Sequence, residues 1–146
     1  MDAYNPAGIF LKKSEYQVAA YCRISREDGD GESNSISTQK KLLQDFISCH
    51  SDMKLHDIYC DDGFTGTNFN RPEFQRMMGD IDNGKVDTVI VKDLSRFGRS
   101  YIDAGKYLER VFPEKQIRFI AINDGIDNLT QAYDISMPIK NMINET

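Results

Sequence analysis

Val18-Ala19-Ala20-Tyr21-Cys22-Arg23-Ile24-Ser25 is the stretch of this chain that decides its fold. The run is apolar up to Arg23, and after Ser25 it breaks into the polar, glycine-containing segment 26–32. A short apolar run that ends at polar turn residues is typical of a buried β-strand. Arg23 and Ser25 are two residues apart, so their side chains share one face of that strand. A hydroxyl beside a guanidinium is suited to meet a phosphate, which makes Ser25 a candidate nucleophile and Arg23 a candidate phosphate ligand.

Three further apolar runs have the character of strands, and helical patterns lie between the runs. The predicted strands span residues 17–25, 54–60, 88–92 and 117–122, and the predicted helices span residues 35–50, 72–83 and 100–112. Ser35 is a typical N-cap residue, and Pro72 is a typical first residue of a helix. This alternation predicts an α/β fold with a mostly parallel central sheet of about four to five strands and flanking helices.

The composition predicts one globular domain. The 146 residues are 40% hydrophobic and 28% charged, which is enough for a single core. We expect residues 1–13 to be a flexible N-terminus and residues 14–146 to be the domain. No apolar run approaches the roughly 20 residues that cross a membrane, and no signal-peptide pattern is present, so we expect a cytoplasmic protein without membrane contact. The net charge of −5 argues against a general polyanion-binding surface.

No cofactor or metal is predicted. Cys22, Cys49 and Cys60 have no regular spacing, which argues against a disulfide framework. Cys49-His50, His56 and Cys60 offer metal-binding side chains, but their spacing matches no standard zinc pattern. The chain also lacks a Walker loop, so we expect no bound nucleotide.

Polar and charged residues follow the predicted strands at their carboxyl ends, the edge where parallel sheets bind ligands. Arg23 and Ser25 end the first strand, Asp61-Asp62 the second, and the segment 93–100 the third. Arg96 and Arg99 are three residues apart and would share a face in a helical turn. Guanidinium groups can stabilise the charge that develops on phosphate oxygens without a metal ion.

Two other residues are predicted to point toward this edge. Gln39 lies on the inward stripe of the first predicted helix, near its amino end, and a buried amide there requires a hydrogen-bond partner. Arg71 is the predicted N-cap of the second helix, where backbone N–H groups favour an anion.

Each residue alone also has an ordinary structural explanation. Ser25 could be a turn residue at a strand end, and Gln39 a buried amide satisfied by the backbone. Single arginines most often form weak surface ion pairs, and Asp61, Asp62 and Asp93 could cap loops. The convergence of these residues on one edge favours the functional interpretation.

Five motifs, in order, resemble the catalytic domain of serine site-specific recombinases, the resolvase and invertase family. They are Tyr21-Cys-Arg23-Ile-Ser25, Ser37-Thr-Gln39, Asp62-Gly-Phe-Thr-Gly66, Asn70-Arg71-Pro72 and Val91-Lys-Asp-Leu-Ser95-Arg96-Phe-Gly-Arg99. The resemblance covers the chain from about Val18 to its end. The loops and the segment 121–125 are most similar to the large serine recombinases of mobile elements.

The resemblance implies a mechanism and a role for each matching residue. Ser25 matches the serine that attacks DNA to form a 5′-phosphoserine intermediate, without metal or ATP, before strands are exchanged and rejoined. Arginines 23, 71, 96 and 99 match the phosphate-binding arginines, and Gln39 matches a glutamine beside the nucleophile. Supporting roles are expected for three aspartates, Asp62, Asp87 and Asp93. Two positions depart from the family: Ser95 stands where many relatives have aspartate, and Asp80 falls about where small resolvases have lysine, which leaves the general acid and base open.

The resemblance also implies partners that this chain contacts only as part of a longer protein. The family continues through a long helix that forms the dimer contact, and the segment 136–146 has the pattern of that helix's first turns. We expect the full-length protein to bind double-stranded DNA recombination sites as a homodimer or tetramer, and the isolated 146-residue piece to be inactive.

Two alternatives remain at this point. One is a receiver-like regulatory domain that uses Asp61, Asp62 and Asp93 as an acidic phosphoacceptor pocket with a divalent cation. The other is a recombinase relative that has lost activity and serves only in assembly.

Overall fold

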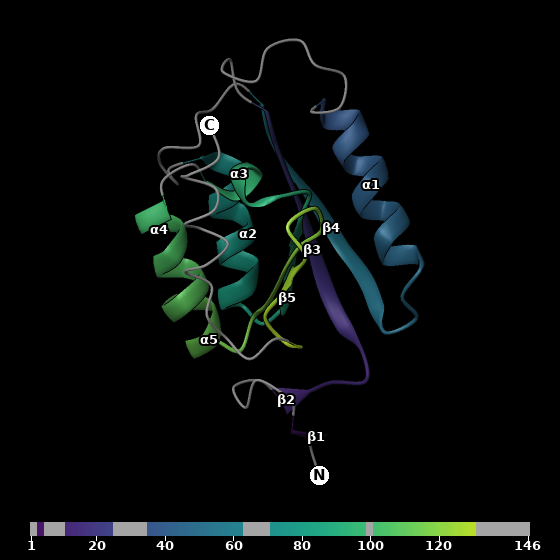
Figure 1. Cartoon of the computed structure of the whole chain (residues 1–146), viewed down its shortest axis with the longest axis vertical. Helices are drawn as coiled ribbons and strands as arrows, with labels where there is room; N and C mark the ends of the chain where they lie inside the picture. The colour runs from purple at the N-terminus through teal and green to yellow at the C-terminus, as the bar shows by residue number, and fades with distance from the viewer. Residues whose placement is uncertain (1–2, 5–10, 25–34, 63–70, 99–100, 131–146) are drawn as a thin grey trace.

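The computed structural model describes residues 3–4, 11–24, 35–62, 71–98 and 101–130 (Figure 1). The described residues therefore leave out several predicted features: Ser25, Arg99, motif residues 63–66 and Asn70, and the terminal helix predicted at residues 136–146.

The main sheet has five strands in the order β4-β3-β5-β6-β7. The strands are β3 (Tyr16–Ile24), β4 (Met53–Asp62), β5 (Thr88–Val91), β6 (Arg118–Ala121) and β7 (Ile126–Asp127). All neighbours pair in parallel except β6 and β7, which pair antiparallel. The predicted mostly parallel α/β sheet is confirmed, and its four longer strands fall where the apolar runs predicted them.

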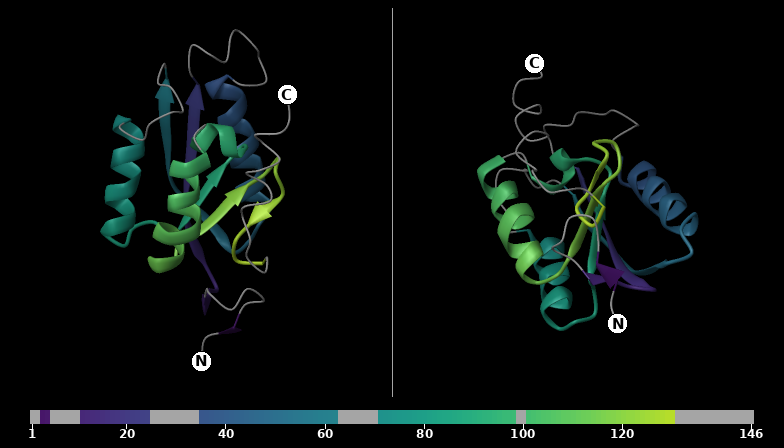
Figure 2. Two further views of the ribbon diagram at one scale, coloured as in Figure 1. Left: turned by 60° about the vertical axis from the view of Figure 1, so that its left-hand side comes forward. Right: turned by 60° about the horizontal axis from the view of Figure 1, so that its bottom comes forward.

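Helices cover both faces of this sheet (Figure 2). On one face lies α1 (Ile36–Ser48), and on the other lie α2 (Pro72–Asp82), α4 (Tyr101–Lys106) and α5 (Phe112–Glu114). The hydroxyl of Ser35 accepts a hydrogen bond from the backbone N–H of Thr38 at 3.2 Å, so Ser35 caps α1 as expected. The short helix α3 (Leu94–Phe97) follows β5 directly.

Three features differ from the sequence-based expectations. The predicted helix at residues 100–112 is a composite, because the π-helical segment η3 (Tyr107–Val111) separates α4 from α5. The strand β7 was not predicted. Within residues 1–13, β1 (Ala3–Tyr4) and β2 (Leu11–Lys12) pair as an antiparallel two-stranded sheet, which was not predicted either.

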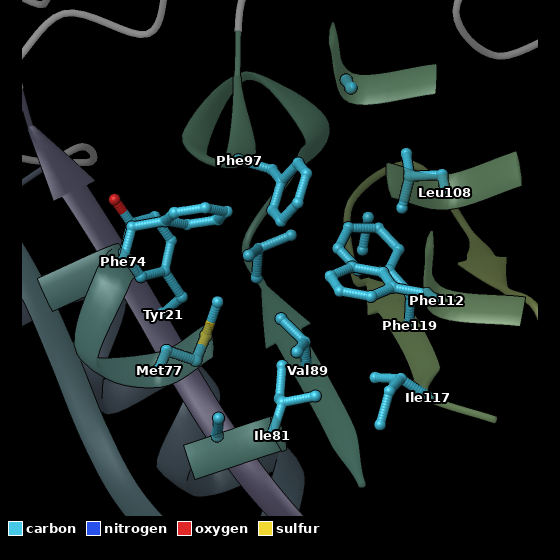
Figure 3. Close-up of a cluster of buried hydrophobic side chains, with 14 of the residues drawn as sticks. Tyr21, Phe74, Met77, Ile81, Val89, Phe97, Leu108, Phe112, Ile117 and Phe119 are labelled. Atoms are coloured by element: carbon cyan, nitrogen blue, oxygen red, sulfur yellow. The ribbon is translucent and has the colours of Figure 1, made fainter. Parts of the chain in front are cut away.

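Alternation along β3 divides the core into two layers. Ala19 and Tyr21 face a cluster with α2, α4 and α5, whereas Val18, Ala20 and Cys22 face α1. Figure 3 shows the first layer, in which the ring of Phe97 from α3 packs among other aromatic side chains. Its ring centroid lies 5.2 Å from Phe119 and 5.6 Å from Phe74, both edge-on. These contacts anchor α3 on the core and so place the residue beside it, Arg96.

Candidate active site

Four buried polar side chains gather near the carboxyl end of β3. Arg23, Gln39 and Arg71 are each 0% exposed, and Arg96 is 3% exposed. They come from four separate elements, since Arg23 belongs to β3, Gln39 to α1, Arg96 to α3, and Arg71 precedes α2. Burial of a charged group is costly unless hydrogen bonds compensate it, so the partners of these side chains decide what the cluster can do.

Gln39 binds the backbone of Arg23 at both ends of its amide. Its Oε1 accepts from the Arg23 backbone N–H at 3.1 Å, and its Nε2 donates to the Arg23 carbonyl oxygen at 3.0 Å. The predicted inward orientation of Gln39 is confirmed, and its partner is main chain. These two bonds hold the carboxyl end of β3, which ends at Ile24, directly before Ser25 in the chain.

The two arginines Arg23 and Arg96 hold each other through backbone carbonyls. Arg96 Nη1 donates to the Arg23 carbonyl oxygen at 2.8 Å, and Arg23 Nε donates to the Arg96 carbonyl oxygen at 3.2 Å. Arg23 Nη2 also donates to the Ser95 carbonyl oxygen at 2.6 Å. Charge-assisted bonds of this kind fix both guanidinium groups in place.

Ser95 and Asp93 support Arg96 from the start of α3. Asp93 caps the helix, since its Oδ1 accepts from the Arg96 backbone N–H at 3.3 Å. The Ser95 hydroxyl donates a short hydrogen bond to the same Asp93 carboxylate. It accepts from Arg96 Nη2 at 3.3 Å, and Arg96 Nε lies 3.8 Å from Asp93 Oδ1. The Ser95 hydroxyl therefore connects a carboxylate to a buried guanidinium.

Arg71 lies on aromatic rings. Its guanidinium carbon is 5.5 Å from the ring centroid of Tyr21 and 5.2 Å from that of Phe74, within the range of cation–π attraction. Its Nη2 donates to the Phe97 carbonyl oxygen at 2.7 Å. Burial lowers the pKa of Arg71 from its ordinary value. Arg71 is the N-cap residue of α2, as predicted, but its side chain makes no capping bond.

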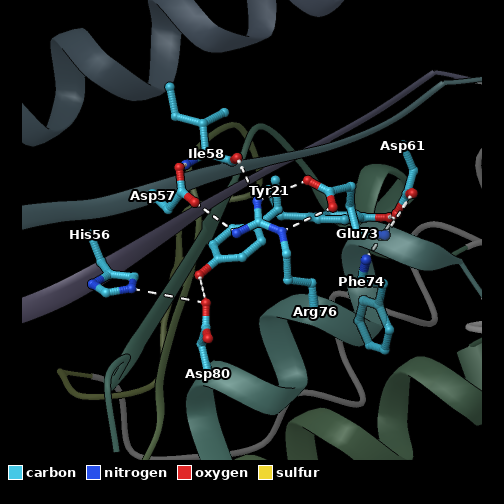
Figure 4. Close-up of polar contacts among 10 residues, drawn as sticks. Tyr21, His56, Asp57, Ile58, Asp61, Glu73, Phe74, Arg76 and Asp80 are labelled. Atoms are coloured by element: carbon cyan, nitrogen blue, oxygen red, sulfur yellow. Dashed lines mark hydrogen bonds and ion pairs between the residues drawn. The ribbon is translucent and has the colours of Figure 1, made fainter.

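The cap of α2 comes from Asp61 at the end of β4 (Figure 4). Asp61 Oδ1 accepts from the Glu73 backbone N–H and Oδ2 from the Phe74 backbone N–H, each at 3.0 Å. The hydroxyl of Tyr21 also donates to Asp61 Oδ2 at 2.8 Å, and burial is the main cause that raises the pKa of Tyr21. Both carboxylate oxygens of Asp61 are thus occupied by the fold, which argues against a receiver-like phosphoacceptor pocket.

Other predicted residues are not gathered with the cluster. Asp87 precedes β5 and lies at the opposite, amino end of the sheet. There Asp87 Oδ1 accepts from the Gln17 backbone N–H at 2.9 Å, and Lys13 Nζ donates to Oδ2 at 3.0 Å. Asp62 is exposed at the end of β4. The short helix α3 ends at Phe97, and Gly98 is extended, with φ −174° and ψ 149°. Arg99 lies outside the described residues, so a helical face shared with Arg96 stays a prediction.

Asp80 lies in the last turn of α2. Its Oδ2 accepts from the Tyr59 hydroxyl at 2.5 Å. The same oxygen lies 3.9 Å from His56 Nε2 (Figure 4). The guanidinium of Arg76 covers the Tyr59 ring at 4.1 Å. These contacts join α2 to β4. They involve none of the four buried side chains at the end of β3.

Two contributors to the site were not predicted from the sequence. Tyr21 is two residues before Arg23 on β3, so the sequence could place both on the same face of the strand. Its hydrogen bond to Asp61 could not be predicted from the sequence. The carbonyl oxygens of Ser95, Arg96 and Phe97 hold two arginines, Arg23 and Arg71, and a carbonyl has no signal in sequence. Within the described parts of the chain, no group of three or more His, Cys, Asp or Glu side chains forms a candidate metal site. No helix in those same parts has the length and hydropathy needed to cross a bilayer.

Comparison with known proteins assigns the family. Residues 18–146 match the family model described as "Resolvase, N terminal domain". The chain belongs to the resolvase family of serine recombinases. Membership implies a DNA recombinase that acts in oligomers. No match was found among curated protein sequences.

Solved structures of serine recombinases resemble this recombinase domain. The N-terminal catalytic domain of TP901-1 integrase is 32% identical with a TM-score of 0.70, over 88% of this chain and 94% of that one. A resolvase family site-specific recombinase from Streptococcus pneumoniae is 30% identical with a TM-score of 0.64, over 88% and 84% of the two chains. The catalytic domain of ISC1926 TnpA, an IS607-like serine recombinase, is 19% identical with a TM-score of 0.60 over 73% and 70%, which shows a shared fold alone. The resemblance read from the five motifs is therefore confirmed.

Proposed function

We propose that this recombinase domain breaks and rejoins DNA in site-specific recombination, with Ser25 as the nucleophile. The observation that carries the proposal is the pair of interlocked guanidinium groups, Arg23 and Arg96, at the strand end that directly precedes Ser25. A phosphodiester attacked by a hydroxyl gathers negative charge on its non-bridging oxygens. Cations that are already fixed by backbone carbonyls stabilise this charge without reorganising during the reaction.

The proposed step is a transesterification. The Ser25 Oγ forms a bond to phosphorus as its proton leaves, and the bond from phosphorus to the 3′ oxygen breaks. The 3′ oxygen takes up a proton and departs as a free hydroxyl, while the 5′ phosphate stays on the serine. Rejoining reverses these events with the 3′ hydroxyl of the partner strand. The phosphoester bond is exchanged and not hydrolysed, so no ATP is consumed.

The other residues have positioning and electrostatic roles in this proposal. Gln39 holds the main chain of Arg23, and Ser95 with Asp93 orients Arg96. Arg71 and Arg99 are proposed further phosphate ligands, Arg71 from its position on the Tyr21 ring and Arg99 from the family motif. Asp62, which is exposed at the end of β4, is a proposed supporting residue. We do not assign Asp87 to the reaction, because its contacts lie at the opposite end of the sheet.

Trapping of the covalent intermediate tests the proposal. The full-length protein is incubated with a nicked suicide substrate and then separated on a denaturing gel, where a protein–DNA adduct migrates slowly. Ser25→Ala should give no adduct while site binding is retained, because only the attacking oxygen is removed. Ser48→Ala is the matched control, since Ser48 is exposed at the end of α1. Wild-type levels of adduct from Ser25→Ala would place the nucleophile elsewhere.

A further inference from the structure

Cys22 and Cys60 lie side by side on neighbouring strands, one residue before Arg23 and Asp61. They are direct register partners on the parallel strands β3 and β4, and both face the core layer under α1. Each thiol is the largest influence on the pKa of the other, through a side-chain hydrogen bond. Cys22 is fully buried and Cys60 is partly exposed, so only Cys60 can be reached from solvent.

The spacing of the pair suits a disulfide. Neighbouring strands lie about 4.7–4.9 Å apart, and disulfides join Cα atoms that are about 4.4–6.8 Å apart. Because the two cysteines are in register, a bond between their sulfurs needs no shift of one strand along the other.

The two thiols differ in chemical character. The hydrogen bond from Cys22 lowers the pKa of Cys60 to about 7, and Lys40 of α1 acts in the same direction. Burial, the second-largest influence, raises the Cys60 pKa, and so do two carboxylates, Glu73 of α2 and Asp61 of β4; each of these effects is smaller than that of the hydrogen bond. The pKa of Cys22 is raised, by its hydrogen bond to Cys60 and by burial. Since the thiolate is the reactive form, Cys60 is the attacking thiol and Cys22 the resolving one.

We propose that Cys22 and Cys60 are an oxidation site that peroxides convert to an intramolecular disulfide. The Cys60 thiolate attacks one oxygen of hydrogen peroxide and becomes a sulfenic acid as hydroxide leaves. The Cys22 sulfur then attacks the Cys60 sulfur, the S–S bond forms and water departs. In total, two thiols and one hydrogen peroxide give one disulfide and two waters. This inference does not depend on the nucleophile assigned above.

The location of the disulfide connects it to the site. Cys22 directly precedes Arg23, and Cys60 directly precedes Asp61, the residue that caps α2. A covalent link between the two strands at this level changes the surroundings of both residues. We therefore expect the backbone amide NMR signals of Arg23 and Asp61 to shift on oxidation.

Mass spectrometry of the 146-residue chain tests the inference. The folded chain is treated with hydrogen peroxide, free thiols are alkylated, and peptides are separated without reduction. We expect a peptide pair joined through Cys22 and Cys60, with Cys49, which is exposed, still alkylated as the internal reference. A Cys60 that remains a free thiol, stops at sulfinic acid or pairs with Cys49 would overturn the proposal.

Two variants test the division of roles. In wild type, alkylation of Cys60 should be half-maximal near pH 7, following its pKa of about 7. Cys22→Ala removes the hydrogen-bond donor, so the midpoint should rise toward the ordinary cysteine value of about 8.5, and the disulfide should be absent. Cys49→Ser is the matched control and should change neither result. If the pH of half-maximal Cys60 alkylation did not change in Cys22→Ala, the paired-thiol assignment would be contradicted. The disulfide test in wild type does not depend on how this variant folds.

Discussion

Replacement of Gln39 should destabilise the domain far more than replacement of its exposed neighbour on the same helix. Gln39 is 0% exposed and makes two hydrogen bonds to the backbone of Arg23, at 3.1 and 3.0 Å. Without the side chain, the Arg23 carbonyl still accepts from Arg96 Nη1, but the Arg23 backbone N–H loses the acceptor in Gln39. The unsatisfied Arg23 backbone N–H therefore accounts for most of the expected loss of stability.

The expected magnitude follows from those contacts. A buried donor left without its acceptor costs about 1–3 kcal/mol. Gln39→Met keeps most of the side-chain volume, so it should lower the free energy of unfolding by about 1–3 kcal/mol. Gln39→Ala also leaves a cavity, which brings the expected loss to about 2–4 kcal/mol. Gln44 is exposed on α1, and Gln44→Ala should stay within about 0.5 kcal/mol of wild type.

Urea unfolding, followed by circular dichroism, measures these free energies. Hydrogen exchange should add a local signature, with faster exchange of the Arg23 amide in both Gln39 variants than in Gln44→Ala. If Gln39→Met and Gln44→Ala were equally stable, the two hydrogen bonds to Arg23 would not contribute as argued. A loss confined to Gln39→Ala would assign the role of Gln39 to packing alone.

Four further outcomes are expected. Arg96→Ala in the full-length protein should slow adduct formation by about 10²–10³, so that adduct still accumulates on long incubation, whereas Ser25→Ala gives none; an Arg96→Ala rate equal to wild type would remove Arg96 from the reaction. Cleavage by the full-length protein should proceed in EDTA, because guanidinium groups provide the positive charge, and a strict need for Mg²⁺ or Mn²⁺ would contradict this. The 146-residue chain, with its net charge of −5, should not select cognate over random duplex in a gel-shift assay at low salt, and tight selective binding would show that the recognition surface lies within it. Arg76 lowers the pKa of Asp57 mainly through a hydrogen bond. The pair therefore stabilises the fold at pH values above the ordinary aspartate pKa of about 3.9, and this stability is lost as the pH falls. Arg76→Gln should raise the Asp57 pKa in an NMR titration, and an unchanged value would exclude the hydrogen bond as the cause.

Most of the secondary structure could be predicted because its signals are local. The strands β3, β4, β5 and β6 are apolar runs, and α1 and α2 have helical stripes that begin at a capping serine or a proline. The strand β7 has two residues, too few to show an alternation. The π-helical segment was also unpredictable. There the Phe112 N–H bonds to the Tyr107 carbonyl five residues back, and Pro113 has no N–H to continue the regular pattern.

The candidate site was predictable only in its membership. Periodicity placed Arg23, Gln39, Arg71 and Arg96 at one edge, and all four are buried there. The sequence placed Asp61 at this edge, and the family resemblance implied a supporting role for Asp87. Only the fold separated them, since it turns Asp61 into the cap of α2 and moves Asp87 to the opposite edge.

The sequence by itself determined the α/β architecture, the family and the set of side chains at the carboxyl end of the sheet, because these depend on residue type and on spacing along the chain. Tertiary structure alone decided how the arginines are held. Arg23, Arg71 and Arg96 donate to the carbonyls of Ser95, Phe97 and Arg23, partners that lie between 26 and 73 residues away in the chain. Every residue has a carbonyl, so nothing in the sequence distinguishes the ones that bind an arginine. Only the packing of α3 against the end of β3 brings those acceptors within hydrogen-bonding distance.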